Sequence, residues 1–183
     1  METKKRAVFF DRDGVLNDTV DRGDGFLSIR EKVRFTAPYF YHEFHPKEGI
    51  SEAITKVKEA GFLSILVTNQ PDVGYGHMPA EEYEKIMTVV KTWPLDDIYV
   101  CVHGREDGCE CKKPKPGMLI AAAAKHQIDL PSSFIIGDTK SDVGAGKAAG
   151  CITILIDDER NRDLTPDFRV VDLAEAIKAI ENF

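Results

Sequence analysis

Side chains that could hold a metal ion or a phosphate come directly after short apolar runs. They are Asp11 and Asp13 after AVFF, Thr68 and Asn69 after FLSILV, and Asp138 after FIIG. If these runs are neighbouring parallel strands, their carboxyl ends share one edge of a sheet, where ligands bind. Crowded carboxylates repel unless a cation lies among them, and hard oxygen ligands suit Mg²⁺. The pattern therefore favours a magnesium site over unrelated caps and turns, which use the same residue types.

A phosphate would bind next to such a cation, and two lysines offer further positive charge. Lys112 and Lys113 come just before a helix that is expected to begin near Pro116. Phosphoryl transfer needs positioning, charge neutralisation and a nucleophile. An Asp carboxylate can be that nucleophile by forming an aspartyl-phosphate. A second carboxyl two residues away, as Asp13 is from Asp11, can act as general acid and base. Taken alone, the lysines favour a solvated basic loop.

A second candidate metal site precedes these lysines with the spacing C-x-H-x5-C-x-C. Its members are Cys101, His103, Cys109 and Cys111. Thiolate and imidazole in a set of four are the ligands of tetrahedral Zn²⁺, although these steps are tighter than zinc-finger spacings. Four protein ligands leave no position for water, so we expect a structural zinc loop over 101–111 that fixes Lys112 and Lys113. The alternative is a loop with incidental cysteines. Cys151 is expected in the core.

The elements that must position these residues alternate between short apolar runs and helical periodicity. Strands are expected at 7–10, 62–67, 98–102, 134–136 and 151–156, and helices near 50–57, 83–90, 118–126, 142–149 and after Asp172. Ser51 is the expected N-cap of the first helix. Strands that alternate with helices imply crossover connections and a mostly parallel sheet covered on both faces. The predicted fold class is therefore α/β with a doubly wound sheet.

Composition is that of one ordinary globular domain over residues 1–183. Hydrophobic residues make up 43% of the chain, and 24 Lys and Arg against 31 Asp and Glu give a formal net charge of −7. This charge argues against nucleic acid and anionic membranes as partners. The apolar runs are far shorter than the roughly 20 residues that span a bilayer, and the amino terminus lacks a signal-peptide core. We expect a cytoplasmic protein, with a monomer favoured and its thiols reduced.

Residues 18–50 form a segment too long for an ordinary connection between a strand and a helix. The segment is polar at first and then rich in rings between Tyr39 and His45. Disorder is one interpretation. So many rings in a short span favour a packed lid.

The order of the motifs resembles that of the haloacid dehalogenase superfamily of phosphohydrolases. The matching segments are DRDGV, the threonine of VTNQ, the second lysine of CKKPKPG, and GDTKSD. They cover nearly the whole chain outside residues 18–50. The resemblance implies that Asp11 is the nucleophile and Asp13 the general acid and base. It implies that Asp11, Asp138 and the Asp13 backbone carbonyl bind Mg²⁺, with Asp142 in or next to the metal's shell. Thr68 and Lys113 are implied to bind the phosphoryl group.

The cysteine and histidine loop before KKPKPGM looks like that of a narrower group. This group comprises the D-glycero-D-manno-heptose 1,7-bisphosphate phosphatases and the related histidinol-phosphate phosphatases, which have no separate cap domain. The resemblance implies removal of the 7-phosphate of the heptose, with histidinol phosphate or another small metabolite as the alternative substrate. The expected substrate contacts are Thr68, Asn69, Gln70, Lys112 and Lys113.

Two features depart from this group. Lys112 replaces the usual arginine, which keeps the charge but loses the bidentate fork, and residues 18–50 are longer than usual. The remaining alternative from another class is a non-enzymatic phosphoacceptor domain, which also combines Asp, Thr, Lys and Mg²⁺. The DxD arrangement and the zinc loop argue against that alternative.

Overall fold

A parallel sheet is the centre of the fold in the computed structural model, which describes residues 4–28 and 31–183. Within these residues, six strands form one sheet in the order β10-β9-β8-β1-β6-β7. The strands are β1 (Arg6–Phe10), β6 (Phe62–Asn69), β7 (Asp97–Cys101), β8 (Phe134–Gly137), β9 (Ile152–Ile156) and β10 (Phe168–Val170). Neighbouring strands pair in parallel throughout. The predicted α/β fold is confirmed, and the carboxyl ends of the strands share one edge.

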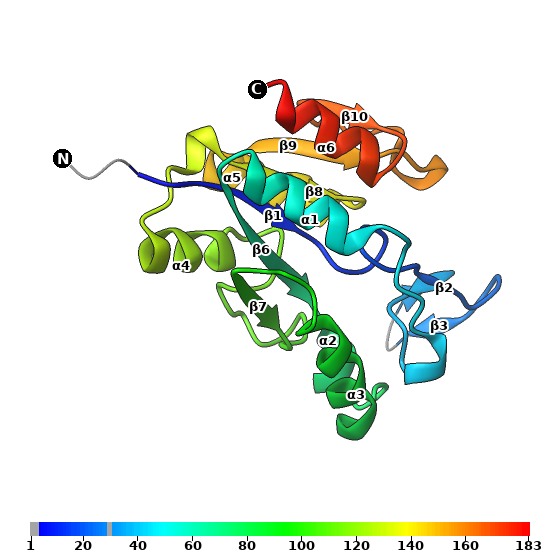
Figure 1. The fold of residues 1–183 in the computed structure, drawn as a ribbon. Helices are drawn as coiled ribbons and strands as arrows, with labels where there is room; N and C mark the ends of the chain where they lie inside the picture. Colours follow the sequence, from blue (N-terminus) through cyan, green and yellow to red (C-terminus); the bar gives the residue numbers. More distant parts are fainter. Residues whose placement is uncertain (1–3, 29–30) are drawn as a thin grey trace.

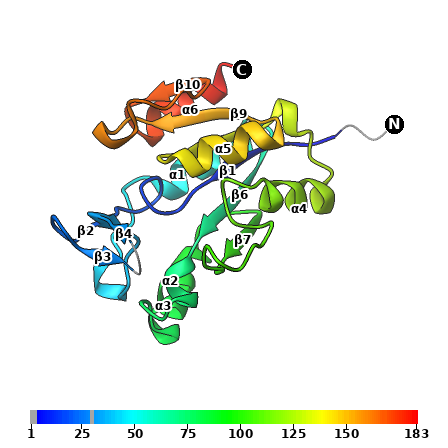
Figure 2. The ribbon, with the colours of Figure 1, turned by 180° about the vertical axis from the view of Figure 1, so that it is seen from behind.

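Helices cover both faces of the sheet. They are α1 (Ile50–Glu59), α2 (Pro71–Gly74), α3 (Ala80–Val90), α4 (Gly117–His126), α5 (Lys140–Ala149) and α6 (Leu173–Glu181), with the short 3₁₀ helices η2 (Leu130–Ser132) and η3 (Glu159–Asn161). α1 and α6 lie side by side in front of the sheet in Figure 1. α4 and α5 cover the opposite face, which Figure 2 shows from behind. No helix among the described residues is both long and apolar enough to cross a membrane.

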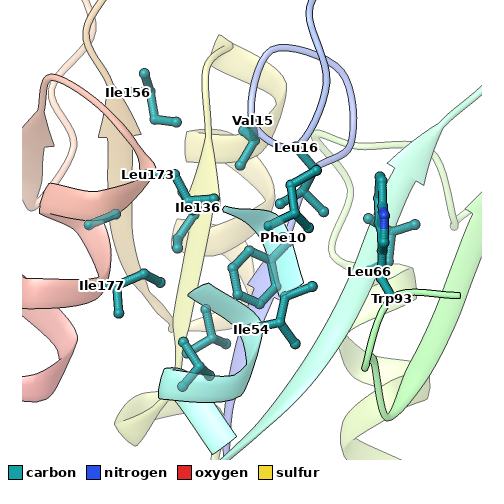
Figure 3. Packing of buried hydrophobic residues seen from close by; sticks show 14 of the residues in the cluster. Phe10, Val15, Leu16, Ile54, Leu66, Trp93, Ile136, Ile156, Leu173 and Ile177 are labelled. Atoms are coloured by element: carbon teal, nitrogen blue, oxygen red, sulfur yellow. The ribbon is translucent and has the colours of Figure 1, made fainter. Parts of the chain in front are cut away.

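Two apolar layers hold these helices on the sheet. In the front layer, Phe10, Leu66 and Ile136 of the strands pack with Ile54 of α1 and Ile177 of α6 (Figure 3). The rear layer is built from strand residues that point the other way, together with α4 and α5. Because both faces of the sheet are buried, the central strands form nearly continuous apolar runs. These runs are the reason that the strands could be predicted from the sequence.

The structure differs from the expectation at one helix start and adds one edge strand. Gly49, and not Ser51, is the N-cap of α1, and it has a φ of 75°, a conformation that glycine adopts without a steric penalty. The sequence did not predict β10, because this edge strand has three residues and buries only the last. The helix expected after Asp172 is confirmed as α6, and Asp172 is its N-cap, since its side chain accepts a hydrogen bond from the Glu175 amide at 2.8 Å.

The described residues of the segment 18–50, which do not include 29 and 30, are folded. The segment contains β2 (Val20–Asp21) paired with β5 (Phe35–Thr36), β3 (Leu27–Ser28) paired with β4 (Glu31–Lys32), and the 3₁₀ helix η1 (Tyr41–Glu43). β2 and β3 lie beyond the carboxyl ends of the parallel strands (Figure 1). Arg22 and Glu43 form an ion pair inside the segment, and Phe44 stacks on Trp93 with ring centroids 6.3 Å apart. The segment therefore packs on the rest of the domain.

Candidate active site

Carboxylates from separate elements meet at the carboxyl edge of the sheet. Asp11 follows β1, Asp138 follows β8, and Asp142 lies in the first turn of α5; each offers an oxygen within 4.8 Å of the others. β1 and β8 are neighbours, and the Asp11 amide donates to Ile136 O at 3.0 Å. Asp142 is fixed as the capping partner of Thr139, whose amide and hydroxyl donate to Asp142 Oδ2 at 3.1 and 2.6 Å. Backbone pairing and helix capping thus create the cluster.

The ammonium group of Lys113 lies among these carboxylates. Its Nζ is 2.9 Å from Asp11 Oδ1 and 2.5 Å from Asp142 Oδ1. It also donates to Val67 O at 2.8 Å, and the side chain is 1% exposed. Burial lowers the pKa of Lys113, but the charges and hydrogen bonds of Asp11 and Asp142 more than offset this effect and raise it above its ordinary value. Lys113 therefore stays positively charged inside the domain.

The carboxylates carry more negative charge than Lys113 neutralises. Burial raises the pKa of Asp11 to about 7; Asp142 and Asp13 add to the rise, while Lys113 opposes it. Burial also raises the pKa of Asp138 well above its ordinary value, with further contributions from Asp142 and Asp11. Asp138 Oδ1 is buried and has no hydrogen-bond partner within the described chain. Such a set of oxygen donors fits a hard divalent cation, which would favour the ionised forms.

Gly14 allows the chain to pass close to Asp138. Its φ is 86°, and a Cβ at this position would lie 2.2 Å from Asp138 Oδ2. Both the conformation and the close approach require glycine. The Gly14 carbonyl accepts a hydrogen bond from Lys47 Nζ at 2.8 Å. The end of the segment 18–50 is thereby tied to the DRDG motif.

Asp13 is surrounded by side-chain donors. Arg12 contacts Asp13 Oδ1 through Nε at 3.2 Å and Nη2 at 3.0 Å, and Asn17 Nδ2 donates to the same oxygen at 2.9 Å. Gln70 Nε2 donates to Asp13 Oδ2 at 2.6 Å and to Thr68 Oγ1 at 2.9 Å. Asp13 and Thr68 are therefore linked through one amide group.

The other expected substrate contacts are engaged with the protein itself. Asn69 Nδ2 donates to Lys113 O, and Asn69 Oδ1 accepts from Lys113 N, both at 3.0 Å. This pair of bonds fixes the backbone that carries the buried ammonium. Lys112 Nζ donates to His103 O at 3.0 Å, and Gln70 is fully buried.

The cysteine and histidine loop gathers four donors next to these lysines. Cys101 Sγ lies 2.9 Å from Cys111 Sγ and 3.6 Å from Cys109 Sγ, and His103 Nδ1 lies 3.2 Å from Cys111 Sγ. All four donor atoms lie within 4.8 Å of one another. Burial, with the neighbouring Cys101 and Cys109, raises the pKa of Cys111 to about 12. Thiols this close ionise together only with a cation among them, and the donor set fits tetrahedral Zn²⁺.

Arg12 and Asn17 are site residues that the sequence analysis missed. The Arg12 side chain is fully buried. Its position in the sequence, between Asp11 and Asp13, could have indicated a role in the site. A charged residue between Asp11 and Asp13, directly after a buried strand, needs a partner nearby. The sequence does not show that this partner includes Gln70, which is 58 residues away.

Comparisons with known proteins identify the family of the chain. A family model described as HAD-hydrolase-like matches residues 110–176. A Helicobacter pylori protein named D-glycero-beta-D-manno-heptose-1,7-bisphosphate 7-phosphatase is 35% identical over 153 residues, which cover 80% of this chain and 79% of the relative. The chain belongs to the phosphatases of the haloacid dehalogenase superfamily. The family expected from the motifs is confirmed, and with it the assignment as an enzyme.

Further relatives of this phosphatase differ in the anomer for which they are named. A Burkholderia mallei protein, 34% identical over 84% of this chain and 80% of its own length, is named for the alpha anomer of the same heptose. A D,D-heptose 1,7-bisphosphate phosphatase from B. bronchiseptica has the same fold, with a TM-score of 0.78 and 25% identity over 97% of this chain and 98% of that one. Its crystal structure contains magnesium and phosphate.

Proposed function

We propose that this phosphatase removes the 7-phosphate of D-glycero-D-manno-heptose 1,7-bisphosphate, with Mg²⁺ as its cofactor. The observation that carries the proposal is the convergence of Asp11, Asp138 and Asp142 around the buried ammonium of Lys113. The names of the H. pylori and B. mallei relatives support this substrate. The magnesium and phosphate in the B. bronchiseptica structure support the cofactor.

Asp11 is the proposed nucleophile. One of its carboxylate oxygens bonds to phosphorus while the bond from phosphorus to the C7 oxygen breaks. Asp13 gives its proton to the departing oxygen, which leaves as an alcohol. Asp13 then takes a proton from water, the water oxygen bonds to phosphorus, and the bond to Asp11 breaks to release phosphate. Lys113 Nζ, 2.9 Å from Asp11 Oδ1, and the Thr68 hydroxyl bind the phosphoryl oxygens as charge develops.

The proposed Mg²⁺ ligands are Asp11, Asp138 and the backbone carbonyl of Asp13. When bound, the ion would neutralise charge on the carboxylates and on the phosphoryl group. Asp142 accepts a hydrogen bond from Lys113 at 2.5 Å and from the Thr139 hydroxyl at 2.6 Å. We therefore propose that Asp142 lies beside the metal and keeps Lys113 aimed at the phosphoryl group.

A structural Zn²⁺ is proposed for the loop 101–111. The donor set and the short distances among its sulfur and nitrogen atoms support it. Lys112 and Lys113 follow the last cysteine directly, and Lys112 donates back to the loop at His103 O. A metal that fixes this loop would reduce the entropy that the two lysines lose when substrate binds.

We also propose that the protein acts in the cytoplasm.

The segment 18–50 is proposed as a lid over the sugar. On one flank, the Tyr41 amide donates to Glu82 Oε2 of α3 at 2.6 Å. On the other flank, the Arg160 guanidinium lies 4.2 Å from the centre of the Phe35 ring. Asn161, the next residue, donates to Asp138 O at 3.0 Å. These contacts span the carboxyl edge of the sheet.

The test is phosphate release with Mg²⁺ from both anomers of the heptose bisphosphate and from histidinol phosphate at equal concentrations. We expect a clear preference for one heptose anomer. Asp11→Asn should abolish turnover without unfolding the protein, whereas Asp163→Asn, which changes an exposed carboxylate, should not affect turnover. A preference for histidinol phosphate would contradict the substrate, and appreciable activity of Asp11→Asn would contradict the nucleophile.

A further inference from the structure

Gln70 joins two groups with separate roles in the proposed reaction. Its Nε2 donates to Asp13 Oδ2 at 2.6 Å and to Thr68 Oγ1 at 2.9 Å. Its Oε1 accepts from Arg12 Nη2 at 2.8 Å. The Gln70 side chain is fully buried. The backbone N–H of Gln70 donates to Cys101 O at 2.7 Å. The oxygen and the nitrogen of the side-chain amide are thus both bonded to protein groups.

The partners of Gln70 allow one orientation of its amide. A guanidinium donates and cannot accept, so the Gln70 oxygen must face Arg12 and the nitrogen must face Asp13. The Gln70 nitrogen also occupies a lone pair of Thr68 Oγ1, so the Thr68 hydroxyl proton is directed elsewhere. That proton can be donated to a phosphoryl oxygen.

We propose that Gln70 is a positioning residue that holds the Asp13 carboxyl at a fixed place relative to Thr68, an inference that rests on the proposed function for the roles of these two residues. Thr68 would contact a non-bridging oxygen of the phosphate, and Asp13 the departing oxygen of the same phosphate. Arg12 and Asn17 also donate to Asp13, whereas the Gln70 nitrogen joins Asp13 to Thr68 and so sets the spacing between these two side chains. Arg12, held by burial and by Asp13 itself, fixes the other end of the amide.

The test compares two substrates that differ in their need for a general acid. The C7 oxygen of the heptose is a poor leaving group and must be protonated as it departs, whereas p-nitrophenolate departs without protonation. The value of kcat/KM depends on the steps from free enzyme and free substrate up to and including the first phosphoryl transfer. In Gln70→Met, we expect kcat/KM for the heptose bisphosphate to fall about 10- to 100-fold. This loss should exceed the loss on p-nitrophenyl phosphate at least tenfold.

Two further variants complete the comparison. Thr68→Val removes a phosphoryl contact needed by both substrates, so it should lower kcat/KM for both by similar factors. Gln70→Glu keeps the shape of Gln70 but places a carboxylate against Asp13, so it should repeat the unequal losses of Gln70→Met. This second variant also serves if Gln70→Met does not fold.

Equal losses on the two substrates in the Gln70 variants, or no loss on either, would overturn the proposal. A crystal structure of Gln70→Met gives a readout that does not depend on activity. We expect the Asp13 carboxyl to leave its present position there, and an unmoved carboxyl would also overturn the proposal. A wild-type protein inactive on both phosphate esters would contradict the proposed function, while the structures would still decide the role of Gln70.

Discussion

Replacing Lys113 with methionine should destabilise the metal-free protein strongly. Lys113 is buried and contacts Asp11 at 2.9 Å and Asp142 at 2.5 Å. Removing one partner of a buried ion pair costs about 3–5 kcal/mol, because the remaining charges have no compensation. For a chain of this size, we expect the melting temperature to fall by roughly 6–20 °C. Methionine has a similar length, so the loss reports the charge more than a cavity.

Thermal unfolding in buffer without Mg²⁺ measures this effect, with Lys56→Met as the matched control. Lys56 is 48% exposed and pairs with Glu52 at 3.0 Å on the surface of α1, so its replacement should leave the melting temperature almost unchanged. Saturating Mg²⁺ should restore part of the stability lost in Lys113→Met, because the proposed site places the cation among the same carboxylates. If the two variants melt together without Mg²⁺, the charge argument is refuted.

The same variant separates stability from catalysis. With saturating Mg²⁺ and the folded protein, kcat of Lys113→Met should remain about 10²–10³-fold below wild type, because a charged donor to the phosphoryl group is missing. Recovery of kcat together with stability would mean that Lys113 only balances the charges of Asp11 and Asp142.

Three further perturbations test other parts of the molecule. Gly14→Ala would bring a Cβ within 2.2 Å of Asp138 Oδ2, so Mg²⁺ affinity measured by calorimetry should fall at least tenfold; unchanged affinity would contradict the close-approach argument. Burial favours protonation of Asp97, but hydrogen bonds, above all from His126, hold the pKa of Asp97 well below its ordinary value. The resulting stabilisation is present above pH 4 and lost as the pH falls further, so urea unfolding of Asp97→Asn should show a deficit of about 1–2 kcal/mol at pH 7 that shrinks at pH 3. Metal analysis should find zinc in wild type but not in Cys111→Ser, and kcat/KM of this variant should be lower; a variant that keeps both its zinc and its activity would exclude Cys111 as a zinc ligand.

The sequence predicts the parts of this fold whose signals are local. The central strands are buried on both faces, so each forms an apolar run. Polar side chains in the last two positions of β6 and directly after β1 and β8 mark the edge where the site lies. The signal fails where conformation or pairing depends on distant residues. β10 is held by its pairing with β9, and the conformation of Gly49 depends on how residues 18–50 return to α1. Neither leaves a periodic pattern in the sequence.

The same distinction applies to the site. Asp11 and Asp138 are found from strand ends, but the lysine pair at 112–113, taken alone, favours a solvated loop when only the sequence is considered. Burial resolves this ambiguity, because Lys113 Nζ donates to Val67 O inside the domain while Lys112 Nζ donates to His103 O at the surface. Adjacent lysines thus have different environments, since the cysteine loop directs the first outward and Asn69 binds the backbone of the second. The chemistry of the pair is therefore set by two neighbouring loops, and the residue type alone does not determine it.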